Sequence, residues 1–319
     1  MVKYESPKVF AIKHKDLNIR MASRSGGIFT AISDYILENE GVVYGCVLTQ
    51  SMLAKHIRVT SKEERDKMRG SKYIQSSMDD MFNYVKNDLD DGKKVLFTGT
   101  SCQVAGLQLF LGKEYSNLLC VDIVCHGVPS PLIWKNYLFW QEDKANSKVE
   151  AVDFRNKKVF GWRAHVESLY MKNQKRVDSE VFKEMFFRHE ILRPCCHRCP
   201  YKSILHPGDI TIADYWGINN AAPGFDDNKG VSLVLINDDT GSIMFELIKD
   251  KVEYRTCDIA KSMQPALKAP FPSPDNKYWF WNDFYSHSFN YLVRKYTNYG
   301  LINKCKSLAI RLAKKVLRR

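Results

Sequence analysis

The chain has 319 residues, a hydrophobic content of 45% and a formal net charge of +12 at pH 7. This composition is that of an ordinary globular protein and excludes intrinsic disorder. No apolar run approaches the roughly 18 residues that a membrane-spanning helix needs, and the first residues lack the apolar core of a secretory signal. We therefore expect a cytoplasmic protein whose thiols stay reduced.

The positive charge is unevenly distributed along the chain. Residues 301–319 contain no Asp or Glu but hold seven basic residues, which are Lys304, Lys306, Arg311, Lys314, Lys315, Arg318 and Arg319. More than half of the net excess lies in this tail. Because the rest of the chain is only mildly basic, the charge does not indicate a nucleic-acid-binding protein.

The first part of the chain predicts helices and strands in alternation. Apolar residues recur at helical spacing over residues 27–40, and an apolar strand follows over 42–48. A capping-box pattern at Ser61 opens a short helix that ends near Gly70, and residues 78–90 predict another helix.

Two similar units come next, each made of a strand, a glycine-bearing turn and a helix. The first has its strand at 95–97 and a helix through Leu111, and the second has its strand at 118–124 and a helix from Pro131. Such βα units build a mostly parallel sheet, and ligands bind at the carboxyl ends of its strands. We therefore predict an α/β fold.

Beyond about residue 149 the pattern changes, which we interpret as a smaller α+β part that carries a cysteine-rich loop. Its predicted elements are strands at 149–154, 164–170, 209–212 and 231–236 and a helix at 181–189. The expected parts are an α/β part over residues 1–146, an α+β part over 147–300 and a basic amphipathic helix over 301–319. That helix predicts contact with the inner membrane face, although a terminal helix packed on the domain explains the pattern equally well.

The sharpest local signal is a pair of cysteines three residues apart, Cys196 and Cys199. Nine cysteines in a reducing compartment argue against a disulfide framework and favour metal or redox use. The spacing occurs in zinc and iron–sulfur sites alike. No second pair completes a zinc ribbon, and His197 and His206 do not have zinc-finger spacing. Cys195 is an alternative ligand.

Two further thiolates must come from elsewhere if a cluster forms. Cys102 lies in the turn that starts a helix, where backbone amides favour a thiolate, and Cys125 ends an apolar strand. Both are expected on the same rim of the sheet, so these two and the Cys196–Cys199 pair suit a cubane cluster. From the sequence alone, a plain structural role fits Cys102 and Cys125 equally well. We interpret the remaining cysteines, Cys46, Cys120, Cys257 and Cys305, as small buried hydrophobes.

Glycine-bearing turns predict a site for a phosphate-bearing cofactor. Ser25, Gly26 and Gly27 precede the first helix, where glycine permits a close backbone approach and the helix N-terminus offers amide donors, and Arg24 adds charge. The further candidate cofactor contacts are Ser71, Lys72, Tyr73, Gly99, Thr100, Asp214 and Trp216. If no ligand binds, these stretches are explained as a loop, as a helix cap and, for Trp216, as a core tryptophan.

In their order, these motifs resemble the beta-subunit family of coenzyme F-420 hydrogenases and dehydrogenases, including standalone bacterial members found among polysaccharide-biosynthesis proteins. The matching stretches are Ser25-Gly26-Gly27, Gly70-Ser71-Lys72-Tyr73, Thr98-Gly99-Thr100-Ser101-Cys102-Gln103, Cys125-His126-Gly127-Val128-Pro129-Ser130, Cys196-x-x-Cys199, Gly208-Asp209-Ile210-Thr211 through Trp216-Gly217, and Gly230-Val231-Ser232-Leu233. The ordered set is far more specific than any single motif.

The resemblance implies a 4Fe-4S cluster and FAD, with the flavin relaying electrons between the cluster and an organic acceptor. That acceptor is either a deazaflavin-type coenzyme or a small molecule such as a sugar. The resemblance also favours Cys102 and Cys125 as ligands. Many larger relatives carry a ferredoxin-like cysteine run before this module and this chain does not, so we expect a separate ferredoxin-like electron donor. The alternative function is a zinc-stabilised, non-catalytic interaction module.

Overall fold

The computed structural model describes residues 3–300, so the predicted basic helix at 301–319 lies outside the described residues. The chain forms two compact units, each assembled from several stretches. The first unit consists of Met1–His126, Phe154–Ala164 and Cys199–Pro270, and the second of Gly127–Asp153, His165–Arg198 and Phe271–Arg319. This arrangement differs from a single boundary near residue 146, because strands from the later part of the chain return to the first sheet.

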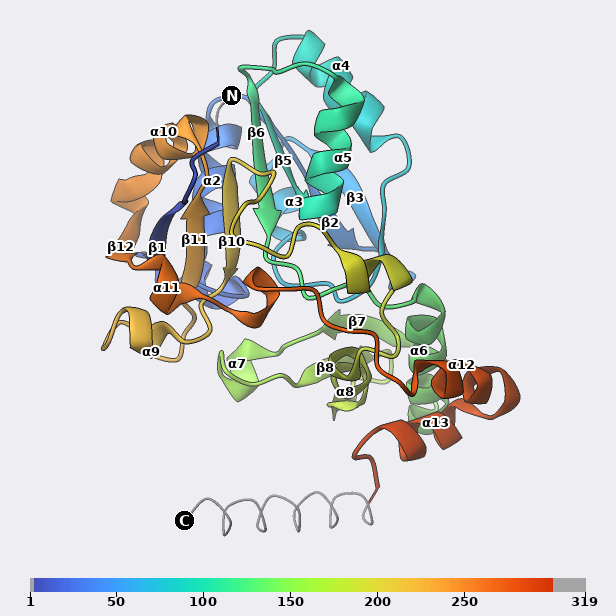
Figure 1. The fold of residues 1–319 in the computed structure, drawn as a ribbon. Coiled ribbons are helices and arrows are strands. Elements are labelled where there is room, and N and C mark those ends of the chain that lie inside the picture. The colour runs from blue at the N-terminus through green and yellow to red at the C-terminus, as the bar shows by residue number, and fades with distance from the viewer. Residues whose placement is uncertain (1–2, 301–319) are drawn as a thin grey trace. The chain divides into compact units, whose positions relative to one another are not determined.

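The described strands of the first unit form a nine-stranded sheet in the order β12-β1-β11-β10-β6-β5-β2-β3-β4 (Figure 1). Their bounds are β1 (Lys8–His14), β2 (Val42–Leu48), β3 (Ala54–Val59), β4 (Ser76–Ser77), β5 (Val95–Thr100), β6 (Leu118–Ile123), β10 (Ile210–Asp214), β11 (Ser232–Ile236) and β12 (Val252–Cys257). The run from β10 through β6 and β5 to β2 is parallel. Strands β11, β1 and β12 extend it on one side and β3 on the other with antiparallel pairs. The α/β fold class predicted from the sequence is confirmed, with a parallel centre and antiparallel flanks.

Helices cover both faces of this sheet. They are α1 (Leu17–Ala22), α2 (Ile28–Glu38), α3 (Lys62–Asp66), α4 (Met81–Asp90), α5 (Ser101–Leu111), α7 (Lys157–Phe160), α9 (Ile218–Ala221), α10 (Asp239–Ile248) and α11 (Ile259–Ser262). Alternate strand residues bury opposite faces: Val43 and Leu96 join the core formed with α2 and α10, whereas Val42 and Val95 join the core formed with α4 and α5. The sheet is therefore the middle layer of the unit.

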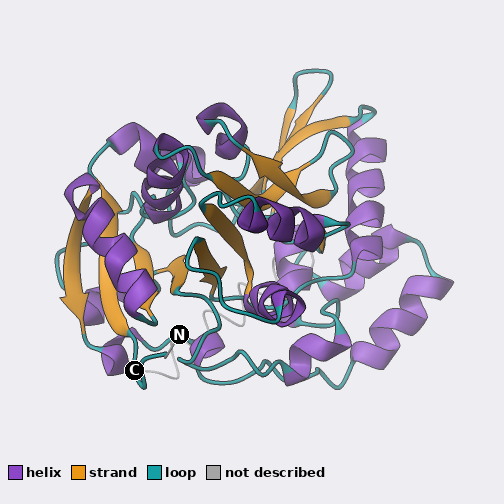
Figure 2. Ribbon diagram, turned by 90° about the horizontal axis from the view of Figure 1, so that it is seen from above, coloured by secondary structure: helices purple, strands orange, loops and turns teal. Residues whose placement is uncertain are grey.

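The second unit combines a small sheet with longer helices. Its elements are α6 (Pro131–Ala145), β7 (Val149–Asp153), β8 (Glu167–Met171), β9 (Arg176–Ser179), α8 (Val181–Arg188), the 3-10 helix η1 (Pro194–Arg198), α12 (Lys277–Ser286) and α13 (Phe289–Tyr296). Its three strands are antiparallel in the order β7-β8-β9. Phe182 packs its ring on those of Trp134 and Tyr137 of α6, at 4.8 and 5.4 Å between centroids. In Figure 2, α6 and α8 belong to the purple helices and the strands are orange.

Local signals explain where several helices begin. The Ser61 hydroxyl accepts the Glu64 N–H at 3.2 Å, as its capping-box pattern predicts. At α5, the Thr100 N–H donates to the Gln103 side chain at 2.9 Å, which completes a capping box directly after β5. Ser130 caps α6, whose first residue is Pro131. The βα turns of the sheet are therefore encoded locally.

Within residues 3–300, no helix is long and apolar enough to cross a membrane. The strands and helices predicted between residues 27 and 145 all occur, with ends within a few residues of the expected ones. Strands β1 and β12 and helices α12 and α13 have no counterpart among the sequence predictions.

Candidate functional site

Two of the predicted cluster ligands lie at one end of two neighbouring strands. Strands β5 and β6 are parallel, and Thr100 pairs with Ile123 at their carboxyl ends. Cys102 is the second residue of α5, directly after β5, and Cys125 follows β6 by two residues. The structure thus places both thiols on the same rim of the sheet, as the βα pattern predicts, in the first unit together with Cys199.

The cysteine loop of the second unit is anchored to the turn after β6. The Ser130 N–H donates to the Ile191 carbonyl at 2.8 Å, and the Arg193 N–H donates to the Val128 carbonyl at 2.9 Å. These bonds bring the Val128 N–H to 3.4 Å from the Cys196 sulfur. Gly127 is required here, because its φ is +144° and a Cβ would lie 2.9 Å from Leu192. The Gly127-Val128 part of the motif therefore supplies an amide donor to a predicted ligand.

Accessibility separates the predicted ligands from Cys120 but not from Cys46 and Cys257, which are partly exposed like Cys125 and are therefore not the buried hydrophobes that the sequence predicts. Cys102 and Cys195 are exposed, and Cys125, Cys196 and Cys199 are partly exposed. Cys120 is buried among the apolar side chains of the core formed with α4 and α5, and burial raises the pKa of its thiol. Burial also raises the pKa of the Cys46 thiol. Thiols that must become ligands need the lower pKa that an accessible position permits.

A buried histidine contacts residues that are close in sequence to the two strand-end cysteines. His206 Nδ1 is 2.8 Å from an Asp122 carboxylate oxygen and 3.1 Å from the Ser101 hydroxyl, and Thr211 donates to the other Asp122 oxygen at 2.6 Å. Because an ionised carboxylate only accepts, Nδ1 carries the hydrogen of this contact. Nε2 is buried and has no hydrogen-bond partner among residues 3–300. Ser101 precedes Cys102 in the chain.

The unpartnered His206 Nε2 is available to a metal ion or another group from outside the chain. A carboxylate that orients an imidazole through one nitrogen and leaves the other free is the usual outer shell of a metal-ligating histidine. His197 differs, because its Nδ1 pairs with the Phe271 carbonyl at 3.0 Å and its Nε2 with Lys277 at 2.8 Å. The geometry therefore does not favour His197 as a zinc ligand. Within the described residues, no three His, Cys, Asp or Glu side chains are arranged to hold a metal ion.

The predicted phosphate turn is filled by the chain's own backbone. A Cβ on Gly26 would lie 2.0 Å from the Ile12 carbonyl oxygen. The Gly26 N–H donates to the Ser232 hydroxyl at 2.9 Å. Gly27 has a φ of +94° and caps α2, and the Ser25 hydroxyl donates to the Val231 carbonyl at 2.6 Å. These three residues hold β1, α2 and β11 together, and they do not fit an open cradle for a cofactor phosphate.

The other predicted cofactor residues after β3 and β5 have mixed roles. The Lys72 ammonium donates to the carbonyls of Lys67, Met68, Arg69 and Gly70, at distances between 2.7 and 3.2 Å, and so closes the end of α3. Thr100 caps α5, and a Cβ on Gly99 would lie 3.1 Å from the Gln103 side chain. Ser71 and Tyr73 are partly buried, and the Tyr73 ring lies edge-on to Phe154 at 5.8 Å between centroids.

Asp214 and Trp216 belong to a buried charged and aromatic cluster. The Asp214 carboxylate pairs with Arg155, accepts the Trp162 Nε1–H at 3.0 Å and lies 3.9 Å from Arg24 Nε. Burial alone would raise the pKa of Asp214, but Arg155 and Arg24 outweigh it and hold the pKa below its usual value. The Trp216 ring stacks on Trp162 at 5.2 Å between centroids.

The sequence patterns do not predict Arg155, Trp162 or Lys157 as site residues. The Lys157 ammonium donates to the carbonyls of Arg20, Ser25 and Lys229, and burial together with the charges of Arg24 and Arg20 lowers its pKa to about 7. All three lie in the short stretch Phe154–Ala164, which belongs to the first unit. An unusual density of Arg, Lys and Trp between residues 155 and 163 was the available signal.

Comparisons with known proteins agree with this architecture. The N-terminal family model for the coenzyme F420 hydrogenase/dehydrogenase beta subunit matches residues 9–83, and the C-terminal model of the same subunit matches residues 92–262. A chain of the xenon-derivatised F420-reducing [NiFe] hydrogenase complex from Methanosarcina barkeri is similar in fold, with a TM-score of 0.53 and 20% identity over 80% of this chain and 85% of that chain. No curated protein matches. The two family models together cover most of the chain, which therefore belongs to the coenzyme F420 hydrogenase/dehydrogenase beta-subunit family, a family that implies an iron–sulfur oxidoreductase.

Proposed function

We propose that the protein is an iron–sulfur flavoprotein in which a 4Fe-4S cluster exchanges electrons with FAD and an organic acceptor. The proposed cluster ligands are Cys102, Cys125, Cys196 and Cys199. The observation that carries the proposal is the position of Cys102 and Cys125 at the carboxyl ends of two paired parallel strands. Accessible thiolates are the ligands that iron–sulfur clusters require.

The chain's own groups would prepare these ligands. Cys102 lies in the first turn of α5, and its sulfur is 3.2 Å from the Thr100 hydroxyl. The Val128 N–H donates to the Cys196 sulfur, and such N–H···S bonds tune the potential of a bound cluster. When bound, the cluster supplies single electrons and the flavin pairs them for two-electron chemistry.

The flavin part of the proposal is supported by the family resemblance and by fewer residues than the sequence predicts. Ser25, Gly26 and Gly27 serve internal packing. Ser71 and Tyr73 are partly buried and follow the solvent-exposed Gly70, so we place the flavin contact there. For the electron source we propose a separate ferredoxin-like protein. For the acceptor we propose a deazaflavin-type coenzyme or a small molecule such as a sugar in polysaccharide biosynthesis.

Metal analysis tests the cluster. Anaerobically reconstituted protein should bind about four irons per chain, the content of one cubane with four thiolate ligands. Cys199→Ser should lose most of this iron, whereas the control Cys46→Ser, whose thiol is not among the proposed ligands, should keep it. Retention of a full cluster by Cys199→Ser would overturn the ligand assignment. Colourless protein that carries zinc would instead support a non-catalytic interaction module.

Flavin binding is measured in a separate experiment. Protein purified with its cluster should release FAD on denaturation, or take it up with a shift in the flavin absorbance bands. Tyr73→Ala should weaken this uptake while iron content stays at the wild-type value. If cluster-containing protein takes up no flavin, the flavin part of the proposal fails and the cluster part stands.

A further inference from the structure

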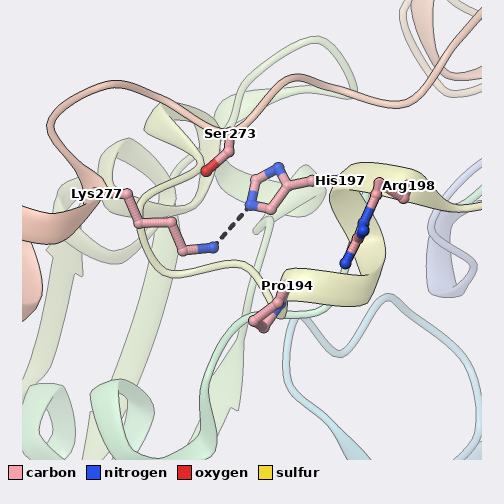
Figure 3. Close-up of a pocket in the computed structure, with 5 residues that line it drawn as sticks. All are labelled: Pro194, His197, Arg198, Ser273 and Lys277. Carbon is pink, nitrogen blue, oxygen red and sulfur yellow. Dashed lines mark hydrogen bonds between the residues drawn. The ribbon is translucent and has the colours of Figure 1, made fainter.

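A basic pocket of about 510 Å³ lies in the second unit, and none of its lining residues is among those proposed to bind flavin. Its lining residues are Pro194, His197, Arg198, Ser273 and Lys277 (Figure 3). Arg198 and Lys277 carry positive charge, His197 is an imidazole, and none of the five is a carboxylate. The volume is within the range of roughly 300–1,000 Å³ that small-molecule sites occupy.

The two walls of the pocket are tied together by hydrogen bonds. One wall is η1, and the other is the segment that leads into α12, whose first residue is Lys277. The Lys277 ammonium donates to the Leu192 carbonyl at 2.7 Å and to His197 Nε2 at 2.8 Å, and Figure 3 shows its side chain directed at the His197 ring. His197 Nδ1 donates in turn to the Phe271 carbonyl at 3.0 Å. The ammonium is therefore positioned in advance of any ligand.

The pocket keeps donor groups that the protein does not use. Arg198 is exposed and has no ion pair or hydrogen bond among residues 3–300, and the same holds for the Ser273 hydroxyl. Lys277 engages two acceptors, which leaves its third N–H without a partner in that part of the chain. In Figure 3 the Arg198 side chain extends toward Pro194, along the pocket wall. A guanidinium, an ammonium and a hydroxyl around one hollow without a carboxylate are complementary to an anion.

We propose that this pocket binds the anionic end, phosphate or carboxylate, of a small organic molecule. Arg198 would supply a planar fork of N–H donors, Lys277 a fixed positive charge and Ser273 a hydroxyl donor. Arg198 and His197 lie between Cys196 and Cys199 in the sequence, so the bound molecule would contact the cysteine motif itself. The anion site requires neither a cluster nor a flavin for its donors, and its test is therefore separate from that of the proposed function.

Calorimetry on the full-length protein, reconstituted anaerobically, tests the site with two probes at constant ionic strength. Pyrophosphate represents the phosphate source and malonate the carboxylate source. At least one of them should bind with a stoichiometry of one. Arg198→Gln should weaken that binding by about tenfold or more, the effect of losing one charge-assisted hydrogen bond. The matched control is Arg193→Gln, which removes the same charge from an exposed residue of the same loop that does not line the pocket.

The outcomes separate a built site from general charge attraction. Tenfold weakening in Arg198→Gln with less than about twofold change in Arg193→Gln supports the proposal. Equal weakening in both variants shows attraction by net charge alone and overturns it, as does the absence of saturable binding of either probe. Lys277→Met should weaken binding as well. If that variant fails to fold because the Leu192 and His197 contacts are lost, Arg198→Gln decides, since the Arg198 side chain holds no other element in place.

Discussion

Replacing Asp214 by Asn tests whether this predicted cofactor residue serves the fold. The carboxylate is buried, pairs with Arg155 and lies 3.9 Å from Arg24 Nε, and the Arg155 side chain is only 3% exposed. An amide keeps an oxygen for the Trp162 Nε1–H but removes the negative charge, which leaves two largely buried guanidinium groups uncompensated. Breaking a buried ion pair on one side costs roughly 3–5 kcal/mol. Because one hydrogen bond survives in the Asn variant, we expect a loss of about 3 kcal/mol.

Urea-induced unfolding followed by tryptophan fluorescence measures this loss, since Trp162 and Trp216 belong to the cluster. The midpoint should fall in Asp214→Asn while the slope of the transition stays unchanged. The control is Glu246→Gln, which removes a surface pair with Lys249 whose side chains are 60% and 48% exposed and should cost less than about 1 kcal/mol. Equal losses in the two variants would refute the argument. An Asp214→Asn protein of unchanged stability that no longer takes up flavin would show that Asp214 contacts the cofactor.

Two further predictions concern buried groups. Burial raises the pKa of Glu167 from 4.5 to about 7, so its contribution to stability is complete below pH 4.5 and is lost as the pH rises through about 7. Glu167→Gln keeps an acceptor for the Tyr137 hydroxyl and the Phe182 N–H. Relative to the wild type, the free energy of unfolding of this variant, measured with urea, should therefore rise by up to about 3 kcal/mol between pH 5 and pH 8. A difference that does not depend on pH would contradict this. Gly26→Ala should prevent folding or cost about 3 kcal/mol, because its Cβ would lie 2.0 Å from the Ile12 oxygen. The comparison variant Gly70→Ala, whose Cβ meets open space at a φ of +82°, should cost only about 1 kcal/mol in thermal unfolding, and similar losses for both variants would contradict the argument from the close contact at Gly26.

The parts of the fold that the sequence predicted are those with local causes. The helix start at Ser61, where the hydroxyl accepts the Glu64 N–H, and the apolar strands β5 and β6 are encoded within a few residues, and the structure has each of them. Strand β1 has no such signal, because it is defined by antiparallel partners far along the chain: Phe10 pairs with Val234 on one side and Thr256 on the other. The return of these late strands to the first sheet is a long-range property, and it also explains why the units are not contiguous in sequence.

The candidate site likewise has parts that local sequence predicts and parts that depend on long-range contacts. The rim position of Cys102 and Cys125 followed from the βα pattern, because carboxyl ends of adjacent parallel strands meet at one edge. The partner of Asp214 could not be predicted, since Arg155 lies 59 residues away in another part of the sequence. Likewise, only the structure shows that His206 reaches Asp122 and Ser101 and leaves one nitrogen unpartnered.

The two motif stretches around Ser25 and Gly230 show that part of the family resemblance reflects a packing requirement of the fold. A Cβ on Gly230 would lie 2.5 Å from the Ser25 carbonyl oxygen, and the Ser25 hydroxyl donates to Val231. Stretches two hundred residues apart thus meet a single packing requirement at the junction of β1, α2 and β11. Residues of this kind identify the fold but carry no information on the substrate. Within residues 3–300, His206 Nε2 and the Arg198 side chain have no partner, and the choice of substrate within this family must therefore be sought among residues like these, which the packing does not use.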